Sequence, residues 1–125
     1  MAKENEFVTH LLELLEPLGR VQAKAMFGGF GMYLKGLMFG LVADDTLYLK
    51  VDEKNRPDYE EKGLGPFTYK RGGRELAMSY HRAPIGAIDD ADDLCAWAKR
   101  AYDAAIRVAR HKERENLERK APRNG

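Results

Sequence analysis

The residues that most often carry out chemistry are few in this chain and far apart. His10, His81 and His111 fall on separate predicted elements, without the spacing typical of metal ligands or of a general base beside its partner. Cys95 is the single cysteine, which excludes an internal disulfide and a cysteine-rich zinc site. We therefore expect no catalytic residues, no metal and no cofactor. A small enzyme centred on Tyr80-His81-Arg82, at the end of a predicted strand, is the least favoured hypothesis.

Three further patterns have simple structural explanations. Gly28-Gly29-Phe30-Gly31 is similar to a phosphate-binding loop, but it lacks the Lys-Ser/Thr pair of a P-loop and lies between strands. A bend with close backbone packing explains these glycines better. The acidic run from Asp89 to Asp93 lacks the residue order of an EF-hand loop and is better explained as a helix cap. At the start of that helix, Cys95 is better explained as a small packed side chain than as an activated thiol.

Large apolar side chains are concentrated in the first half of the chain. In a sheet with helices on one face, about half of the side chains are core and the other half face water or a partner. Exposed aromatic rings could stack on nucleic-acid bases, so an aromatic binding face stays an alternative to an ordinary core. The residues concerned are Met26, Phe27, Phe30, Met32, Tyr33, Met38, Phe39 and Tyr48.

The C-terminal end of the chain is basic. From residue 107 onward seven basic residues stand against three glutamates, a local charge of +4, although the whole chain carries only +1. Arg107, Arg110 and Arg114 recur at helical spacing and therefore share one helix face. Such a face could contact phosphates without regard to sequence, and this binding would weaken as salt rises. The alternative is a solvated helix end whose cations complement the helix dipole.

The periodicity of apolar residues predicts the elements that would position these groups. An amphipathic helix is expected over 4–15, a short helix over 55–62 and a long helix beginning at Asp89 or Asp90. Strands are expected at 21–27, 30–34, 37–39, 47–51, 67–70 and 76–82. The sequence therefore predicts an α+β fold of two layers. An antiparallel sheet, made of a meander plus a hairpin, packs against the N- and C-terminal helices, with a short helix between strands.

Length and composition set the limits of this fold. At 125 residues, with 44% apolar and 33% charged residues, the chain is typical of one globular domain. We expect that domain to span 1–112, followed by a basic, frayed tail over 113–125. The polar N-terminus does not begin a signal peptide, and no stretch resembles a membrane span. A cytoplasmic location and no membrane partner are therefore expected.

Several segments, in order and spacing, resemble one protein family. They are 25–33 (AMFGGFGMY), 38–44 (MFGLVAD), 47–52 (LYLKVD), Asn55-Arg56, 66–69 (PFTY) and 78–80 (MSY). Together they are similar to the N-terminal domain of the TfoX/Sxy bacterial competence regulators, over roughly residues 10–108. The resemblance implies an antiparallel sheet packed against helices and a link to DNA transformation, and it offers no catalytic residues to transfer. The full-length regulators have a second, C-terminal domain, whereas this chain ends in a short basic helix.

Two functions follow from these observations. The first is a non-enzymatic regulatory or adaptor domain that docks an unidentified protein partner through a face or an edge of its sheet. The alternative is weak, sequence-independent nucleic-acid binding through Arg107, Arg110 and Arg114. A homodimer stays open. An exposed apolar patch on the sheet would favour the first function, and a positive surface joining these arginines to Arg71 and Arg74 would favour the second.

Overall fold

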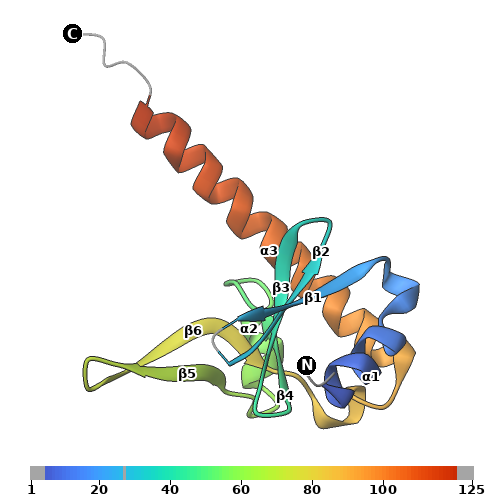
Figure 1. Cartoon of the computed structure of the whole chain (residues 1–125). Helices are drawn as coiled ribbons and strands as arrows, with labels where there is room; N and C mark the ends of the chain where they lie inside the picture. The colour runs from blue at the N-terminus through green and yellow to red at the C-terminus, as the bar shows by residue number, and fades with distance from the viewer. Residues whose placement is uncertain (1–4, 27, 121–125) are drawn as a thin grey trace, which may run out of the picture.

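Six antiparallel strands form one sheet, and helices cover one of its faces (Figure 1). The computed structural model describes residues 5–26 and 28–120. The predicted α+β fold is confirmed: β1 to β4 form a meander, and the β5–β6 hairpin joins it through β6, so the strand order is β1-β2-β3-β4-β6-β5. The helices are α1 (Glu6–Leu14), α2 (Arg56–Glu60) and α3 (Ala91–Lys120), with 3-10 turns at η1 (Glu16–Leu18) and η2 (Ile85–Ala87). The strands are β1 (Val21–Met26), β2 (Gly29–Leu34), β3 (Leu37–Ala43), β4 (Thr46–Lys50), β5 (Pro66–Arg71) and β6 (Arg74–Arg82).

Two-residue turns set the register of the meander. Lys35 and Gly36, between β2 and β3, both have positive φ, and so do Asp44 and Asp45 between β3 and β4. Two consecutive residues of positive φ make the turn whose twist matches that of the flanking strands, and aspartate is one of the few side chains that tolerate it. These turns fix the pairing next to them, and an irregularity between Met32 and Tyr33 then shifts the β2–β3 register by one residue.

The hydrophobic core lies between the sheet and the helices. Leu47, Leu49 and Val51 alternate along and just beyond β4 and are all buried in this core. Trp97 of α3 is 7% exposed and packs inside this core. Ala98, Ala101 and Ala105 are also buried, so small side chains let α3 approach the sheet closely. Both α1 and the first half of α3 thus lie on this face, which we call the core face.

The C-terminal helix extends well beyond the sheet. Asp90 caps its start, because a carboxylate oxygen of Asp90 accepts a hydrogen bond from the Asp93 backbone N–H at 3.0 Å. The helix then continues to Lys120, so residues 113–120 are helical where fraying was expected. Its second half projects away from the body in Figure 1. Although α3 has 30 residues, neither it nor any other described helix is apolar enough to cross a membrane. The last part of the predicted frayed tail, 121–125, lies outside the described residues, and the domain division after 112 stays a prediction.

Candidate functional site

The three predicted arginines occupy different environments on α3. Arg107 is half-buried, and its guanidinium donates hydrogen bonds from Nε and Nη2 to the two carboxylate oxygens of Asp52, the second at 2.9 Å. Arg110 and Arg114 are exposed on the projecting part of the helix. The structure therefore places Arg107 in an intramolecular ion pair and leaves the other two on the surface.

A tight loop after β4 prepares Asp52 for this pairing. One carboxylate oxygen of Asp52 also accepts hydrogen bonds from the backbone N–H groups of Lys54 and Asn55, at 3.0 and 3.2 Å. The buried Asn55 side chain in turn accepts from the Asp52 N–H and donates to the Lys50 carbonyl. The bonds from Arg107 hold the pKa of Asp52 below its ordinary value. This network fixes the end of β4 to α3, which is a structural role for Arg107.

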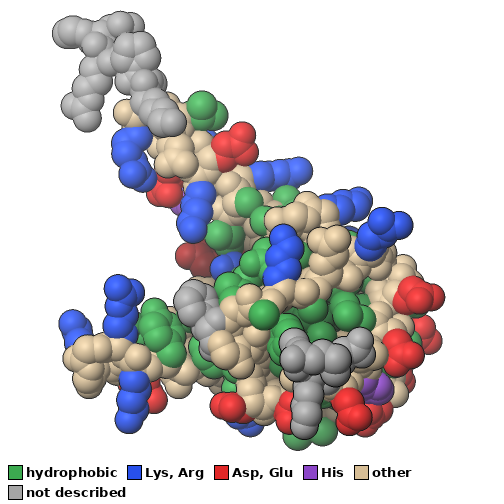
Figure 2. Space-filling model, viewed as in Figure 1, with side chains coloured by type: hydrophobic (Ala, Val, Ile, Leu, Met, Phe, Trp, Pro, Cys, Tyr) green, Lys and Arg blue, Asp and Glu red, His purple; other side chains and the backbone are tan. Residues whose placement is uncertain are grey.

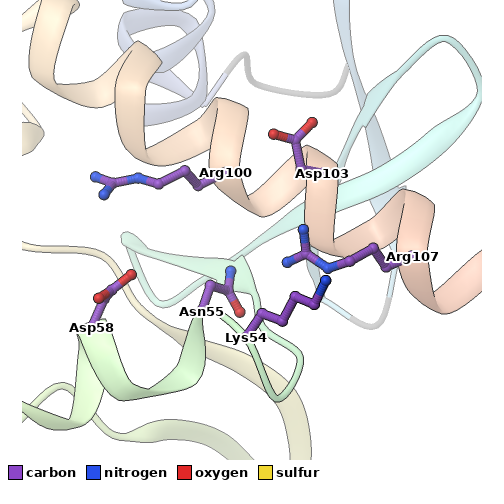
Figure 3. Close-up of a pocket in the computed structure, with 6 residues that line it drawn as sticks. All are labelled: Lys54, Asn55, Asp58, Arg100, Asp103 and Arg107. Atoms are coloured by element: carbon purple, nitrogen blue, oxygen red, sulfur yellow. The ribbon is translucent and has the colours of Figure 1, made fainter.

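A shallow hollow of about 190 Å³ lies beside this loop, between α2 and α3 (Figure 3). Both cations and carboxylates line it, and two of them already have partners: Arg107 is bonded to Asp52, and Asp103 to Lys99. The guanidinium of Arg100 lies over the Trp97 ring, with 4.5 Å from the guanidinium carbon to the ring centroid. The lining residues are Lys54, Asn55, Asp58, Arg100, Asp103 and Arg107.

The Tyr80-His81-Arg82 run is divided between the two faces of the sheet. His81 is buried on the core face, and its Nδ1 lies 2.8 Å from the Leu64 carbonyl oxygen. Its ring packs 5.8 Å from the ring of Tyr59, whose pKa is raised by burial and whose buried hydroxyl has no hydrogen-bond partner among the described atoms. Neighbouring residues in a strand alternate faces, so Tyr80 and Arg82 lie on the opposite side of the sheet from His81.

The other candidate groups are also engaged in the fold. Nε2 of His10 lies 2.9 Å from the Ile88 carbonyl oxygen, and the Cys95 thiol donates to the Leu14 carbonyl at 3.3 Å. Burial raises the pKa of Cys95, which opposes thiolate formation. No three His, Cys, Asp or Glu side chains within 5–26 and 28–120 are grouped so as to hold a metal ion.

Gly29 and Gly31 of the glycine-rich segment serve close packing, as expected, whereas Gly28 has a positive φ and open space around it. A Cβ at Gly29 would lie 2.1 Å from the Val42 carbonyl oxygen of the neighbouring strand. A Cβ at Gly31 would lie 2.7 Å from the sulfur of Met26 and 2.9 Å from the ring of Tyr33. Gly31 therefore makes room for side chains that lie over the backbone of β2, on the face away from the core.

This second face, which we call the outer face, is rich in aromatic residues. Strand register places the members of each cross-strand pair on the same side: Leu41 pairs with Tyr48, and Tyr48 with Arg82. The ring of Phe67 meets that of Tyr48 edge-on at 5.1 Å. Leu41 and Tyr80 are buried although they are not part of the core cluster. The alternation along the strands assigns to the outer face Met26, Tyr33, Met38, Leu41, Tyr48, Phe67, Tyr69, Leu76, Met78 and Tyr80.

Lysines lie directly over two of these rings. Nζ of Lys24 is 4.8 Å from the centroid of Tyr33, and Nζ of Lys50 is 4.8 Å from that of Tyr80. Burial, together with the nearby charge of Lys112, lowers the pKa of Lys50. Burial raises the pKa of Tyr80 to about 12, and the neighbouring Tyr33 adds to this shift. The outer face thus combines rings with cations, and Lys112 of α3 lies near enough to Lys50 to affect its pKa.

The outer face was only partly predictable from the sequence. Met32 and Phe39 of the predicted aromatic set are buried in the core, whereas Tyr33 and Tyr48 are on the outer face. Phe27 lies outside the described residues. Sequence reasoning missed Lys24 and Lys50, whose signal was their alternation with apolar residues in β1 and β4. The tip of the β5–β6 hairpin, with Arg71 and Arg74, projects in a different direction from α3, and both projections carry Lys and Arg side chains (Figure 2).

Comparison with known proteins gives consistent results. The family model of the TfoX N-terminal domain matches residues 13–105. Over 95 residues, 76% of the chain, the sequence is 26% identical to Protein Sxy of Escherichia coli K12, and the match covers 46% of that protein. Over 77 residues, 58% of the chain, it is 30% identical to DNA transformation protein TfoX1 of Aliivibrio fischeri ES114, and the match covers 37% of that protein. The chain thus spans less than half the length of these curated relatives.

Proposed function

Because this chain belongs to the TfoX N-terminal domain family, we propose that it is a non-catalytic regulatory domain that serves DNA transformation in the cytoplasm by docking a protein partner. The positions of the candidate catalytic groups support a binding role. His81 and Cys95 are each engaged by a backbone carbonyl in the fold. A nucleophile or general base needs a free position beside its substrate.

The single observation that carries the proposal is the edge strand β1. It pairs with β2 over six consecutive residues without a register shift, and within the described part of the chain no strand pairs with its other side. An exposed, regular edge is a template for adding a strand from another protein. Ala25 of β1 is exposed, so this strand can be reached from solvent. The opposite edge strand, β5, begins with Pro66 and contains a register shift, which makes it a poorer template.

Site-specific photo-crosslinking in the native cell tests this docking mode. A photo-crosslinking amino acid in place of Ala25 is expected to capture one discrete protein partner. The same amino acid in place of Ala96, which is exposed on α3, serves as the matched control and is expected to capture none. Equal capture at both positions, or none at Ala25, would contradict docking at β1.

A chimera tests the link to DNA transformation. This chain would replace the matching segment of TfoX1 in an Aliivibrio fischeri strain that lacks TfoX1. We expect the chimera to restore the frequency of DNA uptake. If the chimera is present at the level of intact TfoX1 but does not restore DNA uptake, the proposed role of this domain in DNA transformation is contradicted.

The second candidate is nucleic-acid binding through α3, and the exposure of Arg110 and Arg114 favours it. Arg107 contributes less, because Asp52 already neutralises its charge. Under this alternative, Arg110→Glu weakens binding to duplex DNA of any sequence, and truncation after Val108 removes it. Each lost phosphate contact reduces the slope of the logarithm of the binding constant against the logarithm of the salt concentration by about 0.9. A titration followed by fluorescence anisotropy at low salt decides the question, since a flat signal there would exclude this role.

A further inference from the structure

The charges on the outer face are all of one sign. Its strand positions hold Lys24, Lys50, Arg71, Arg74 and Arg82, as the register of the six strands shows. None of the outer-face strand positions within the described residues holds an aspartate or a glutamate. This is unusual in a chain with 20 acidic residues, whose net charge is only +1. The acidic pair nearest to this face in sequence, Asp44 and Asp45, lies in the β3–β4 turn at its end.

The rings form a broad platform between these cations. Tyr33, Tyr48 and Tyr80 come from three different strands, and Phe67 connects Tyr48 to Tyr69, with 6.5 Å between the centroids of Phe67 and Tyr69 and 16° between their planes. Six strands spaced by roughly 4.8 Å give a width of about 24 Å, enough for several nucleotides. Tyr69 is 38% exposed, so its ring is open to a ligand.

We propose that the outer face of the sheet binds single-stranded DNA, with bases stacked on the rings of Tyr33, Tyr48 and Tyr69 and phosphates held by Lys24, Lys50 and Arg82. This proposal does not depend on the protein partner at β1. Bases and aromatic rings stack in a sequence-tolerant way, and flanking cations follow the phosphate backbone. Duplex DNA hides its base faces, so a stacking platform selects single strands.

The composition of the face also bears on the choice between DNA and RNA. Proteins distinguish RNA by hydrogen bonds to its 2′-hydroxyl groups. Apart from its tyrosines and cations, the outer face offers only Gln22 and Thr46 as polar side chains, both near its margin. RNA of the same sequence should therefore bind no more tightly than DNA.

The lysines over Tyr33 and Tyr80 fit this role. Each is already held beside a ring by a cation–π contact, a geometry worth about as much as a weak hydrogen bond at an exposed site. At Tyr33, which is half-buried, Lys24 can exchange its ring contact for a phosphate when a base takes its place on the ring. Lys112 adds a positive charge near Lys50 at the same end of the face, where the Asp52 carboxylate opposes its effect.

Fluorescence anisotropy with a labelled oligothymidine of about 12 nucleotides tests the proposal on the intact chain. We expect binding at about 50 mM salt that weakens towards 200 mM, and weaker binding of the matched duplex. Tyr33→Leu and Tyr69→Leu should each weaken binding about tenfold, because each removes one stacking ring. Tyr33→Phe keeps the ring and should bind like the wild type, which separates loss of stacking from loss of folding.

A matched pair of charge variants tests the face itself. Lys24 and Lys70 are both exposed strand lysines, but Lys70 lies on the opposite side of the hairpin from Tyr69 and Arg71. Lys24→Gln should reduce the salt slope by about 0.7, the value for one phosphate of a single strand, whereas Lys70→Gln should leave it unchanged.

Several outcomes would overturn the proposal. Flat anisotropy of the labelled oligothymidine at low salt would show that the face does not bind single-stranded DNA. The face would then be left for a protein partner or for a second copy of the chain, and sedimentation would detect the second copy as a dimer. Equal losses from Lys24→Gln and Lys70→Gln, unchanged binding by both tyrosine-to-leucine variants, or tighter binding of duplex would also contradict it. Markedly tighter binding of RNA would exclude single-stranded DNA as the preferred ligand.

Discussion

The ion pair between Asp52 and Arg107 provides a sharp test of the structural role assigned to Arg107. The side chain of Asp52 is 14% exposed and that of Arg107 is 34% exposed. Exposed pairs contribute up to about 1 kcal/mol, and removal of one partner from a fully buried pair costs about 3–5 kcal/mol. For this partly buried, two-bond pair we expect an interaction free energy of about 1–2 kcal/mol, between those limits.

The single variants should differ in a defined way. Arg107→Ala should lower the free energy of unfolding by about 1–2 kcal/mol, because it removes only the pair. Asp52→Ala should cost about 1 kcal/mol more, because Asp52 also accepts hydrogen bonds from the N–H groups of Lys54 and Asn55, as a helix cap does. The double variant should be about as stable as Asp52→Ala. Arg110→Ala, on an exposed neighbouring turn, is the control and should change stability by less than about 0.5 kcal/mol.

Urea denaturation of the four variants, followed by circular dichroism, measures these differences. The pH dependence adds a second test. The pKa of Asp52 is lowered in the folded state, so the stabilisation is fully present above the unfolded value of about 3.9. It is lost as the pH falls through the lower, folded value. An interaction free energy below about 0.3 kcal/mol at pH 7 would refute the reasoning. Arg107 would then be available to contact a ligand, like Arg110 and Arg114.

Three further predictions concern the core, the sheet and the thiol. Trp97→Ala should cost about 3–5 kcal/mol, since Trp97 is 7% exposed and meets the ring of Tyr59 edge-on at 5.1 Å; a thermal midpoint within about a degree of wild type would show a surface position instead. Gly29→Ala should lower the thermal midpoint by several degrees, because the new methyl group would meet the Val42 carbonyl oxygen and the strands must separate. Cys95 should react with a thiol reagent much more slowly in the folded chain than after unfolding, because burial raises its pKa; equal rates in both states would contradict this.

Local sequence signals were sufficient to predict most of the fold. The alternation of Leu47, Tyr48, Leu49 and Lys50 identifies a strand with one buried face, and the structure confirms it. The pair Lys35-Gly36 correctly predicted a tight hairpin. In each case the deciding interactions involve neighbours along the chain, so the residue pattern alone contains the information.

Interactions between distant segments were not predictable in the same way. Asp52 and Arg107 are 55 residues apart, and nothing near either residue marks them as partners. Helical spacing therefore placed Arg107 with Arg110 and Arg114, although its charge is used inside the fold. The outer face was not predictable for the same reason, because its single sign of charge becomes visible only after six strands are aligned in register. The continuation of α3 past Glu113 also exceeds what its sparse apolar residues indicated.

The most direct test of the account is a titration of the ¹⁵N-labelled chain with the oligothymidine, followed by two-dimensional NMR spectra. The central claim is that the chain binds through its sheet, with the outer face as the nucleic-acid surface. We predict that the amide signals that move belong to β2, β4 and β6, including Tyr33, Lys50 and Arg82, while those of the core-face helix α1 stay in place. Shifts confined to residues 107–120 of α3, or no shifts at all, would contradict the claim.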